Sequence, residues 1–220
     1  MDGTVAVPNP KGKIAMSTTP RRALLVIDVQ EAYVTGSLRI EYPPIEQSLH
    51  NIGLAMDAAR AHGIPVVVVQ HTGFGVDSPN WPLHAVVASR PKDHHIDKTL
   101  PSVFAQTDLA DWMAQQGINT LTVVGYMTQN CNASTVYEAH HRGVNVEYLS
   151  DATGAVPYAN RVGRASAEEI HRVLSVIFES NFGAVLSTQE WMAALESGQV
   201  PQRDNVMDSN QRALSHNTPT

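Results

Sequence analysis

Short runs of continuous apolar residues alternate along this chain with longer segments whose apolar residues recur at helical spacing. Such runs are typical of strands that are covered on both faces. They lie at residues 23–28, 65–70, 120–124, 144–149 and 183–186, with a briefer candidate at 95–98. Helical spacing is found at residues 45–62, 109–116, 128–142, 166–179 and 188–195. The alternation predicts an α/β fold of three layers, doubly wound, with a mostly parallel six-stranded sheet and helices on both faces.

Apolar periodicity is missing at both ends of the chain, which bounds the folded domain. Ser166 and Glu169 have the spacing of a capping box and predict where one of the later helices begins. The last apolar-patterned segment ends near Leu195, and the residues from Glu196 onward are polar. We therefore predict an N-terminal arm at 1–20, one domain at 21–196 and a polar, poorly ordered C-terminal tail at 197–220.

Composition narrows the function classes. The chain has 220 residues, of which 43% are hydrophobic and 16% charged, as expected for a soluble globular protein. Its formal net charge of −6 argues against nucleic acid as a partner. A single cysteine excludes an internal disulfide framework and fits a reducing compartment. The first 22 residues hold no long apolar run, which predicts no signal peptide, no membrane partner and a cytoplasmic location.

Chemically active side chains follow the predicted strands. In a parallel sheet, ligands bind at the carboxyl ends of the strands, where Asp28, His71, Lys98 and Cys131 would gather. Three of these residues also have a less specific interpretation: Asp28 as a turn cap, Lys98 as a solvated charge and Cys131 as a small buried hydrophobe. A thiol in the first turn of a helix meets the positive end of the backbone dipole, so we expect a lowered pKa for Cys131.

Three motifs carry a family resemblance. They are Leu25-Val-Ile-Asp28-Val-Gln30, Asp97-Lys98-Thr99, and Gly125-Tyr-Met-Thr-Gln-Asn-Cys131. In this order and at this spacing, the chain resembles the isochorismatase-like cysteine hydrolases, which include nicotinamidases and N-carbamoylsarcosine amidohydrolases. The resemblance covers about residues 22–195 and implies a catalytic triad of Asp28, Lys98 and Cys131. It also implies an oxyanion hole made by the backbone amides of Met127 and Cys131, with a cis peptide between Tyr126 and Met127.

The residue types fit covalent hydrolysis of a carbonyl compound. Cys131 would attack the carbonyl carbon and form an acyl-enzyme, which water then hydrolyses. Asp28 would take the thiol proton and return it to the leaving group, and Lys98 would favour the thiolate. True isochorismatases usually lack the cysteine, so its presence favours cleavage of a C–N bond in a small amide, carbamoyl or ureido substrate.

No metal site or cofactor is predicted. Nicotinamidases carry an Asp-x-His metal motif after the second strand, where this chain has Gln70-His71 without the aspartate. His94, His95 and Asp97 are close in sequence, but adjacent residues of a strand point to opposite faces. The predicted enzyme is therefore metal-independent.

Aromatic side chains are expected to line a substrate pocket, because small planar or partly apolar amides suit such walls. His71 either orients the substrate or hydrogen-bonds within the core. Gln30 and Thr128 are expected to support the site structurally. The predicted lining residues are Tyr33, His71, Phe74, Trp81, Phe104, Tyr126 and Tyr158.

Two other functions remain open: a vinyl-ether or ester hydrolase on the same scaffold, and a catalytically silent protein with a binding or assembly role. The resemblance also implies a homo-oligomer, a dimer or a tetramer. Val173, Ile177 and Trp191 would then either cover a subunit interface or simply pack on the sheet.

Overall fold

The computed structural model describes residues 19–216. Most of the predicted N-terminal arm, and the last four residues of the chain, lie outside this range. Within it, no helix combines the length and apolar character that a membrane crossing requires.

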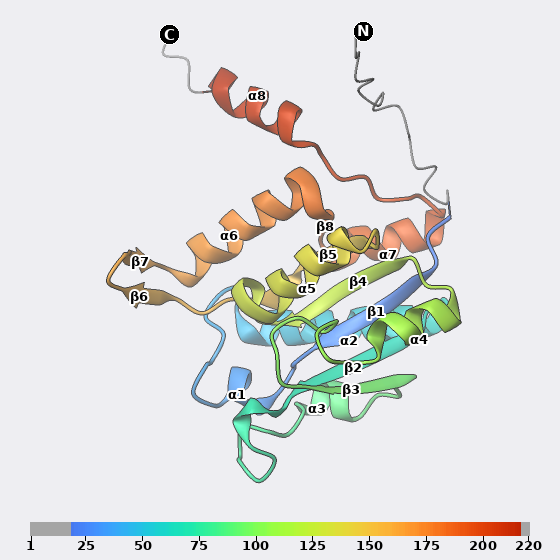
Figure 1. Cartoon of the computed structure of the whole chain (residues 1–220), viewed down its shortest axis with the longest axis vertical. Coiled ribbons are helices and arrows are strands. Elements are labelled where there is room, and N and C mark those ends of the chain that lie inside the picture. Colours follow the sequence, from blue (N-terminus) through green and yellow to red (C-terminus); the bar gives the residue numbers. More distant parts are fainter. Residues whose placement is uncertain (1–18, 217–220) are drawn as a thin grey trace, which may run out of the picture.

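A six-stranded sheet forms the centre of the molecule, in the order β3-β2-β1-β4-β5-β8 (Figure 1). All five strand pairings are parallel, which confirms the predicted sheet. The strands are β1 (Arg22–Ile27), β2 (Val66–His71), β3 (His94–Lys98), β4 (Thr120–Tyr126), β5 (Asn145–Gly154) and β8 (Ala184–Leu186). The chain starts near the middle of the sheet and winds outward in both directions, as a doubly wound fold does.

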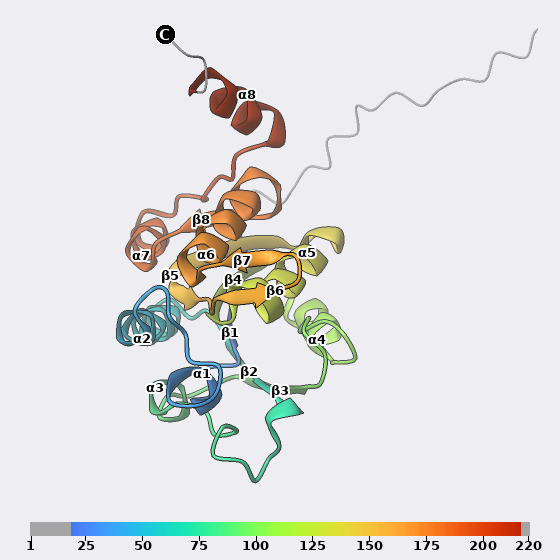
Figure 2. The same cartoon turned by 90° about the vertical axis from the view of Figure 1, so that its left-hand side faces the viewer.

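Helices cover both faces of this sheet (Figure 2). One face packs against α2 (Ile45–Ala61), α3 (Ala85–Ala88) and α7 (Thr188–Ser197), and the other against α4 (Leu109–Gln116), α5 (Ala133–His141) and α6 (Ala167–Ile177). Successive residues of β1 serve opposite faces: Leu24 and Val26 belong to the α2 side, and Leu25 and Ile27 to the α5 side. This burial on both faces explains why the strands are continuously apolar rather than alternating.

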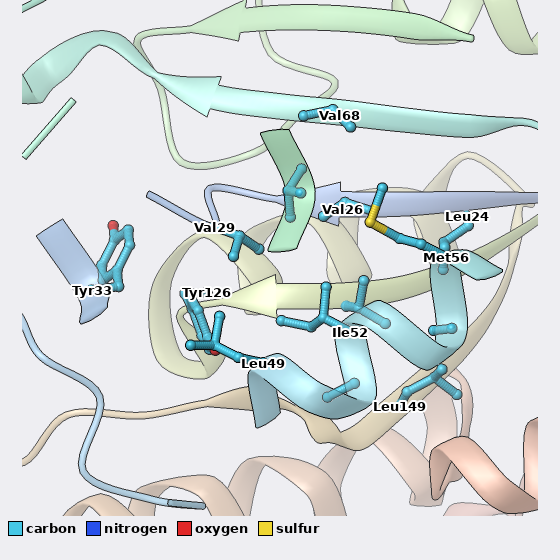
Figure 3. Close-up of a cluster of buried hydrophobic side chains, with 14 of the residues drawn as sticks. Leu24, Val26, Val29, Tyr33, Leu49, Ile52, Met56, Val68, Tyr126 and Leu149 are labelled. Atoms are coloured by element: carbon cyan, nitrogen blue, oxygen red, sulfur yellow. The ribbon is translucent and has the colours of Figure 1, made fainter. Parts of the chain in front are cut away.

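The core on the α2 side shows how helical spacing is used (Figure 3). Leu49, Ile52 and Met56 lie on one face of α2 and pack over Leu24 and Val26 of β1. Each fully buried side chain of this size contributes roughly 1.5–3 kcal/mol through removal of apolar surface from water.

Several elements differ from the sequence prediction. Residues 72–92, to which the apolar pattern assigns no strand or helix, contain the short helices η1 (Thr72–Phe74) and α3, and another short helix, α1 (Glu31–Val34), follows β1. A two-stranded hairpin, β6 (Tyr158–Asn160) and β7 (Gly163–Ala165), precedes α6. These pieces are too short to show a hydrophobic period, so only their contacts define them.

The C-terminal tail is the clearest correction. It was expected to be poorly ordered, but residues Val206–His216 form the helix α8. In both views α8 stands apart from the other helices (Figures 1 and 2). The capping box at Ser166 and Glu169 is confirmed at the start of α6.

Candidate active site

The predicted residues meet at the carboxyl edge of the sheet because of the strand register. Ile27 of β1 pairs with Val69 of β2 on one side and with Gly125 of β4 on the other. His71 at the end of β2 pairs with Lys98 at the end of β3. Asp28, which directly follows β1, therefore lies between the ends of these strands.

Lys98 joins the other two members of the predicted triad. Its Nζ lies 2.8 Å from Oδ2 of Asp28 and donates to Sγ of Cys131 at 3.1 Å. Asp28 and Cys131 are fully buried, and Lys98 is 2% exposed. Burial of an ammonium between a carboxylate and a sulfur carries a desolvation cost that a surface lysine would not have. Lys98 is therefore not a solvated surface charge.

Backbone conformation places Asp28. Its φ of 50° is left-handed, a conformation that aspartate tolerates better than most residues, and it turns the chain sharply after β1. Gly125 allows β4 to approach at the same point: a Cβ there would lie 2.1 Å from the carbonyl oxygen of Ile27. Only glycine fits this close contact between β1 and β4.

Cys131 sits in a π-helical turn, η2 (Thr128–Asn132), rather than in the regular helix predicted from Thr128. The turn follows a cis peptide between Tyr126 and Met127, as the resemblance implied. Two side chains tie it down: Asn132 donates Nδ2 to the carbonyl of Gly125 at 2.9 Å, and Thr135 donates Oγ1 to the carbonyl of Cys131 at 2.7 Å. Insertion of one residue into a helix is a common device at functional sites.

Burial dominates the electrostatics of this cluster. It raises the pKa of Asp28, and Lys98 partly offsets that effect. Burial and the Asp28 charge together raise the pKa of Cys131 to about 12, although Lys98 lowers it. The expectation of a lowered thiol pKa is therefore wrong for the resting protein, because desolvation and a neighbouring carboxylate outweigh the lysine and the helix end. These shifts favour a neutral thiol in the resting protein.

Gln30 connects the end of β2 to the loop that follows it. Its Oε1 accepts from the backbone N–H of His71 at 2.8 Å, and its Nε2 donates to the carbonyl of Trp81 at 2.8 Å. A fully buried amide with both ends bonded fixes the end of β2 relative to the loop that follows it.

Thr128 supports the turn that carries Cys131, through a contact that sequence reasoning missed. Its Oγ1 lies 2.9 Å from Nδ1 of His171 on α6 and 3.0 Å from the hydroxyl of Tyr148 on β5. Burial lowers the pKa of His171 to about 4, so the ring is neutral near pH 7. No local signal marks His171, which is one of only two buried residues of its helix.

Three of the predicted pocket-lining aromatic residues, Tyr33, Phe74 and Tyr126, pack against one another. The ring of Tyr33 lies 5.4 Å from that of Phe74 and 5.9 Å from that of Tyr126. The charges of Asp28 and Cys131 contribute to raising the pKa of Tyr33, which places this phenol within electrostatic range of the triad. His71 lies 5.8 Å from Phe74, and its Nδ1 accepts from the N–H of Gly73. Burial and the nearby Lys98 lower the pKa of His71.

The other lining candidates differ in position. Tyr126 is fully buried and its hydroxyl is 2.6 Å from that of Ser48, contacts that favour packing. Phe104 is also buried, with the guanidinium of Arg142 5.0 Å from its ring centroid. Tyr158 is 44% exposed on the β6–β7 hairpin, and the half-buried Trp81 is fixed through its backbone carbonyl.

Two cavities among the described residues, of about 650 and 400 Å³, lie elsewhere and include none of the triad residues. In the conformation described, Cys131 is closed off from solvent. A substrate would reach its sulfur only after neighbouring side chains or loops move.

Among residues 19–216, no group of three or more His, Cys, Asp or Glu side chains could hold a metal ion. His94 bonds Asp108 and His95 bonds Asp97, so the adjacent histidines serve different partners.

With this geometry in place, the comparisons with known proteins define the class. The Isochorismatase domain matches residues 22–190, and the chain therefore belongs to the isochorismatase family of hydrolases. A crystal structure of an isochorismatase-family protein from Burkholderia xenovorans LB400 is 56% identical, with a TM-score of 0.89, over 90% of this chain and 99% of that one.

More distant relatives have more specific names. Streptothricin hydrolase of Streptomyces noursei is 35% identical over 63% of this chain and 56% of its own length. A ureidoacrylate amidohydrolase of Methylobacterium radiotolerans is 26% identical over 78% of each chain. A cysteine hydrolase structure from Pseudomonas syringae pv. phaseolicola 1448A is 26% identical, with a TM-score of 0.74, over 80% of this chain and 93% of that one. The chain spans about half the length of the streptothricin hydrolases that it matches.

Proposed function

We propose that this protein is a metal-independent cysteine hydrolase that cleaves a C–N bond of a small amide, carbamoyl or ureido compound. The observation that carries the proposal is the position of Lys98 Nζ, 2.8 Å from Asp28 and 3.1 Å from Cys131. Burial of all three groups costs free energy. Such a buried cluster of charges is typical of a site where they serve a reaction.

The first half of the reaction forms a thioester. Substrate binding brings a carbonyl carbon to Sγ of Cys131 while Asp28 removes the thiol proton, so a C–S bond forms as the carbonyl oxygen becomes an oxyanion. The backbone amides of Met127 and Cys131 are the proposed donors to that oxyanion, a contribution worth about 3–4 kcal/mol per donor in other enzymes. The tetrahedral intermediate then collapses, the C–N bond breaks, and Asp28 gives its proton to the departing amine.

The second half regenerates the thiol. Water attacks the thioester carbon while Asp28 takes one of its protons, the C–S bond breaks, and the proton returns to sulfur. The ammonium of Lys98 stabilises whichever of the two partners is anionic. The raised pKa of Asp28 suits a group that must both accept and donate a proton.

Amide chemistry is favoured over the alternatives by the presence of a nucleophilic side chain. A vinyl ether can be opened without a covalent intermediate, whereas transfer of an acyl group to sulfur requires Cys131 and a base beside it. The names of two relatives, a streptothricin hydrolase and a ureidoacrylate amidohydrolase, support hydrolysis of this kind.

Replacement of the nucleophile tests the proposal. Cys131→Ala should abolish ammonia or amine release across a panel of small amides and ureido compounds, while its thermal midpoint stays close to that of the wild type. Ser197→Ala, a change of similar size on the exposed end of α7, is the matched control and should keep full activity.

Intact-protein mass spectrometry completes the test. During turnover the wild type should carry an acyl adduct that maps to Cys131, and the alanine variant should carry none. Turnover of amides by Cys131→Ala would remove the cysteine from the mechanism. Hydrolysis of vinyl ethers or esters alone would favour the second hydrolase, and a lack of any turnover would favour a silent family member.

A further inference from the structure

Helix α6 buries a histidine against the turn η2, which carries Cys131. His171 is 5% exposed, and Ala167, one helical turn earlier, is the only other buried residue of this helix. The capping box of Ser166 and Glu169 fixes where the helix begins and thereby the face on which His171 lies. Burial of an imidazole costs free energy unless its nitrogens are hydrogen-bonded, so the partners of this ring define its role.

The partners of the ring assign its hydrogen. Burial lowers the pKa of His171 to about 4, so the ring is neutral near pH 7 and carries a single N–H. A hydrogen bond with the backbone of Ser150 partly offsets that shift, as expected where the ring donates to a carbonyl. The tautomer with its hydrogen on Nε2 fits this donation and leaves Nδ1 as an acceptor. Oγ1 of Thr128, 2.9 Å from Nδ1, is then the donor to it.

The hydroxyl of Thr128 extends this contact to the backbone of η2. Its hydrogen is used on His171, so its oxygen accepts from the hydroxyl of Tyr148 at 3.0 Å. Thr128 is fully buried and is the first residue of η2, directly after Met127 and three residues before Cys131. A β-branched side chain has few rotamers, so two hydrogen bonds on its hydroxyl also restrain the backbone that carries it.

An aromatic contact holds the imidazole as well. The rings of His171 and Tyr42 lie 5.6 Å apart at an angle of 61°, an edge-to-face arrangement. Tyr42 lies shortly before α2, so the approach to α2, the helix α6 and the turn η2 all meet at this ring. A side chain that is locked by packing as well as by hydrogen bonds is a firm support for a neighbouring site.

We propose that His171 is a positioning residue, which holds η2 in its reactive geometry through the hydroxyl of Thr128. This role rests on the proposed function, in which Sγ of Cys131 and the amide of Met127 must meet one substrate carbonyl together. Displacement of reacting groups by about 1 Å can lower a rate roughly a hundredfold, so support of this turn affects the reaction directly. His171 acts through Thr128 and not on the substrate. The competing role is simple packing of α6 on the domain.

Two replacements of His171 separate positioning from packing. The amide of asparagine lies where Nδ1 lies in histidine, so His171→Asn still offers Thr128 an acceptor. The amide of glutamine lies where Nε2 does, so His171→Gln keeps only the bond to Ser150. His171→Gln should lower kcat by about tenfold to a hundredfold with KM nearly unchanged, whereas His171→Asn should keep most of the wild-type kcat. His50→Gln, at an exposed histidine of α2, is the matched control and should leave both constants unchanged.

Replacement of Thr128 tests the other half of the contact. Thr128→Val removes the hydroxyl at similar shape and should lower kcat as much as His171→Gln does, and Thr128→Ser should restore it. The double variant Thr128→Val with His171→Gln should lose no more kcat than either single variant, because both changes break the same contact. Losses that multiply in the double variant would show that the two residues act separately, against the proposal.

Amide hydrogen exchange of the peptide spanning 127–135 gives a readout that does not depend on turnover. Exchange should rise in His171→Gln and Thr128→Val, and stay near the wild-type rate in His171→Asn and Thr128→Ser. A wild type without amidase activity would refute the proposed function, and the exchange rates would still decide whether His171 holds η2. Equal kcat and equal exchange in the two His171 variants would overturn the proposal and leave packing as the role of this residue. Should His171→Gln fail to fold by circular dichroism, the two Thr128 variants decide in the same way.

Discussion

At the scale of single residues, the site depends on how three charges and protons are shared in a dry environment. Asp28, Lys98 and Cys131 have almost no contact with water, so the pKa values of Asp28 and Cys131 reflect their charged neighbours as well as burial. The lysine is the only positive member and stabilises either anion. Its contribution can be separated from that of the proposed nucleophile, because removal of Lys98 changes the proton affinity of Asp28 without removing this proposed base.

Lys98→Met should lower kcat/KM by about two to four orders of magnitude, within the range that positioned acid–base groups supply. Lys98 lowers the pKa of Asp28, so its loss should move the acid limb of the pH profile to higher pH. The limb reports Asp28 because the base must be ionised to accept the thiol proton. Lys92→Met, at an exposed lysine, should leave the profile unchanged. An acid limb that stays in place or moves to lower pH would contradict this assignment.

Stability should report the same pairing. Asp28→Asn leaves Lys98 as an uncompensated buried cation, and Lys98→Met leaves Asp28 as an uncompensated buried anion, so each should cost about 3–5 kcal/mol. The double variant contains neither charge and should be destabilised by clearly less than the sum of the two. Urea denaturation of the four proteins at neutral pH measures the coupling. If the free-energy losses of the two single variants simply add in the double variant, the ion pair does not form in solution.

At the scale of elements, one buried carboxylate joins four parts of the fold. Glu147 of β5 accepts from Nε and Nη2 of Arg22 on β1, at 2.8–3.0 Å, and from Oγ1 of Thr122 on β4. It also accepts from Nε1 of Trp191 on α7 at 2.8 Å. Trp191 is fully buried in the core on the α2 side. It therefore packs on the sheet and does not cover a subunit interface.

Glu147→Ala should destabilise the protein by about 3–5 kcal/mol, because it leaves Arg22 without its carboxylate at a largely buried position. Trp191→Phe keeps most of the packing and loses one charge-assisted hydrogen bond, at a cost of about 1.5–3 kcal/mol. The surface pair Arg39–Glu46 is the control, since its side chains are 61% and 78% exposed. Glu46→Ala should change the free energy of unfolding by less than about 1 kcal/mol. If Glu147→Ala and Glu46→Ala lowered the free energy of unfolding equally, the buried carboxylate would not stabilise the sheet more than a surface ion pair does.

At the scale of the whole molecule, the domain and its C-terminal helix behave as separate parts. Residues 22–190 match the Isochorismatase domain, and α8 lies beyond that match. Helix α8 projects from the domain in both views (Figures 1 and 2), and all of its residues from 206 to 215 except Ser209 are exposed, including Arg212.

Trypsin should therefore cut after Arg212 several-fold faster than after Arg22, whose side chain is paired with the buried Glu147 in the central sheet. Cleavage within a central strand requires the domain to unfold, whereas cleavage on the exposed α8 requires only local opening. Mass spectrometry of the released peptides follows both cuts over time. Equal rates at the two sites would contradict this division of the molecule.

The sequence by itself determined the layered fold and the three polar residues of the site. Continuous apolar strands and helices with one apolar face leave few arrangements other than a covered parallel sheet, whose strand ends gather Asp28, Lys98 and Cys131. The tertiary structure alone decided the protonation of the thiol, since desolvation depends on residues from every layer. It also decided which faces of α6 and α8 are open, because apolar periodicity shows that a helix has an apolar face and not what that face meets.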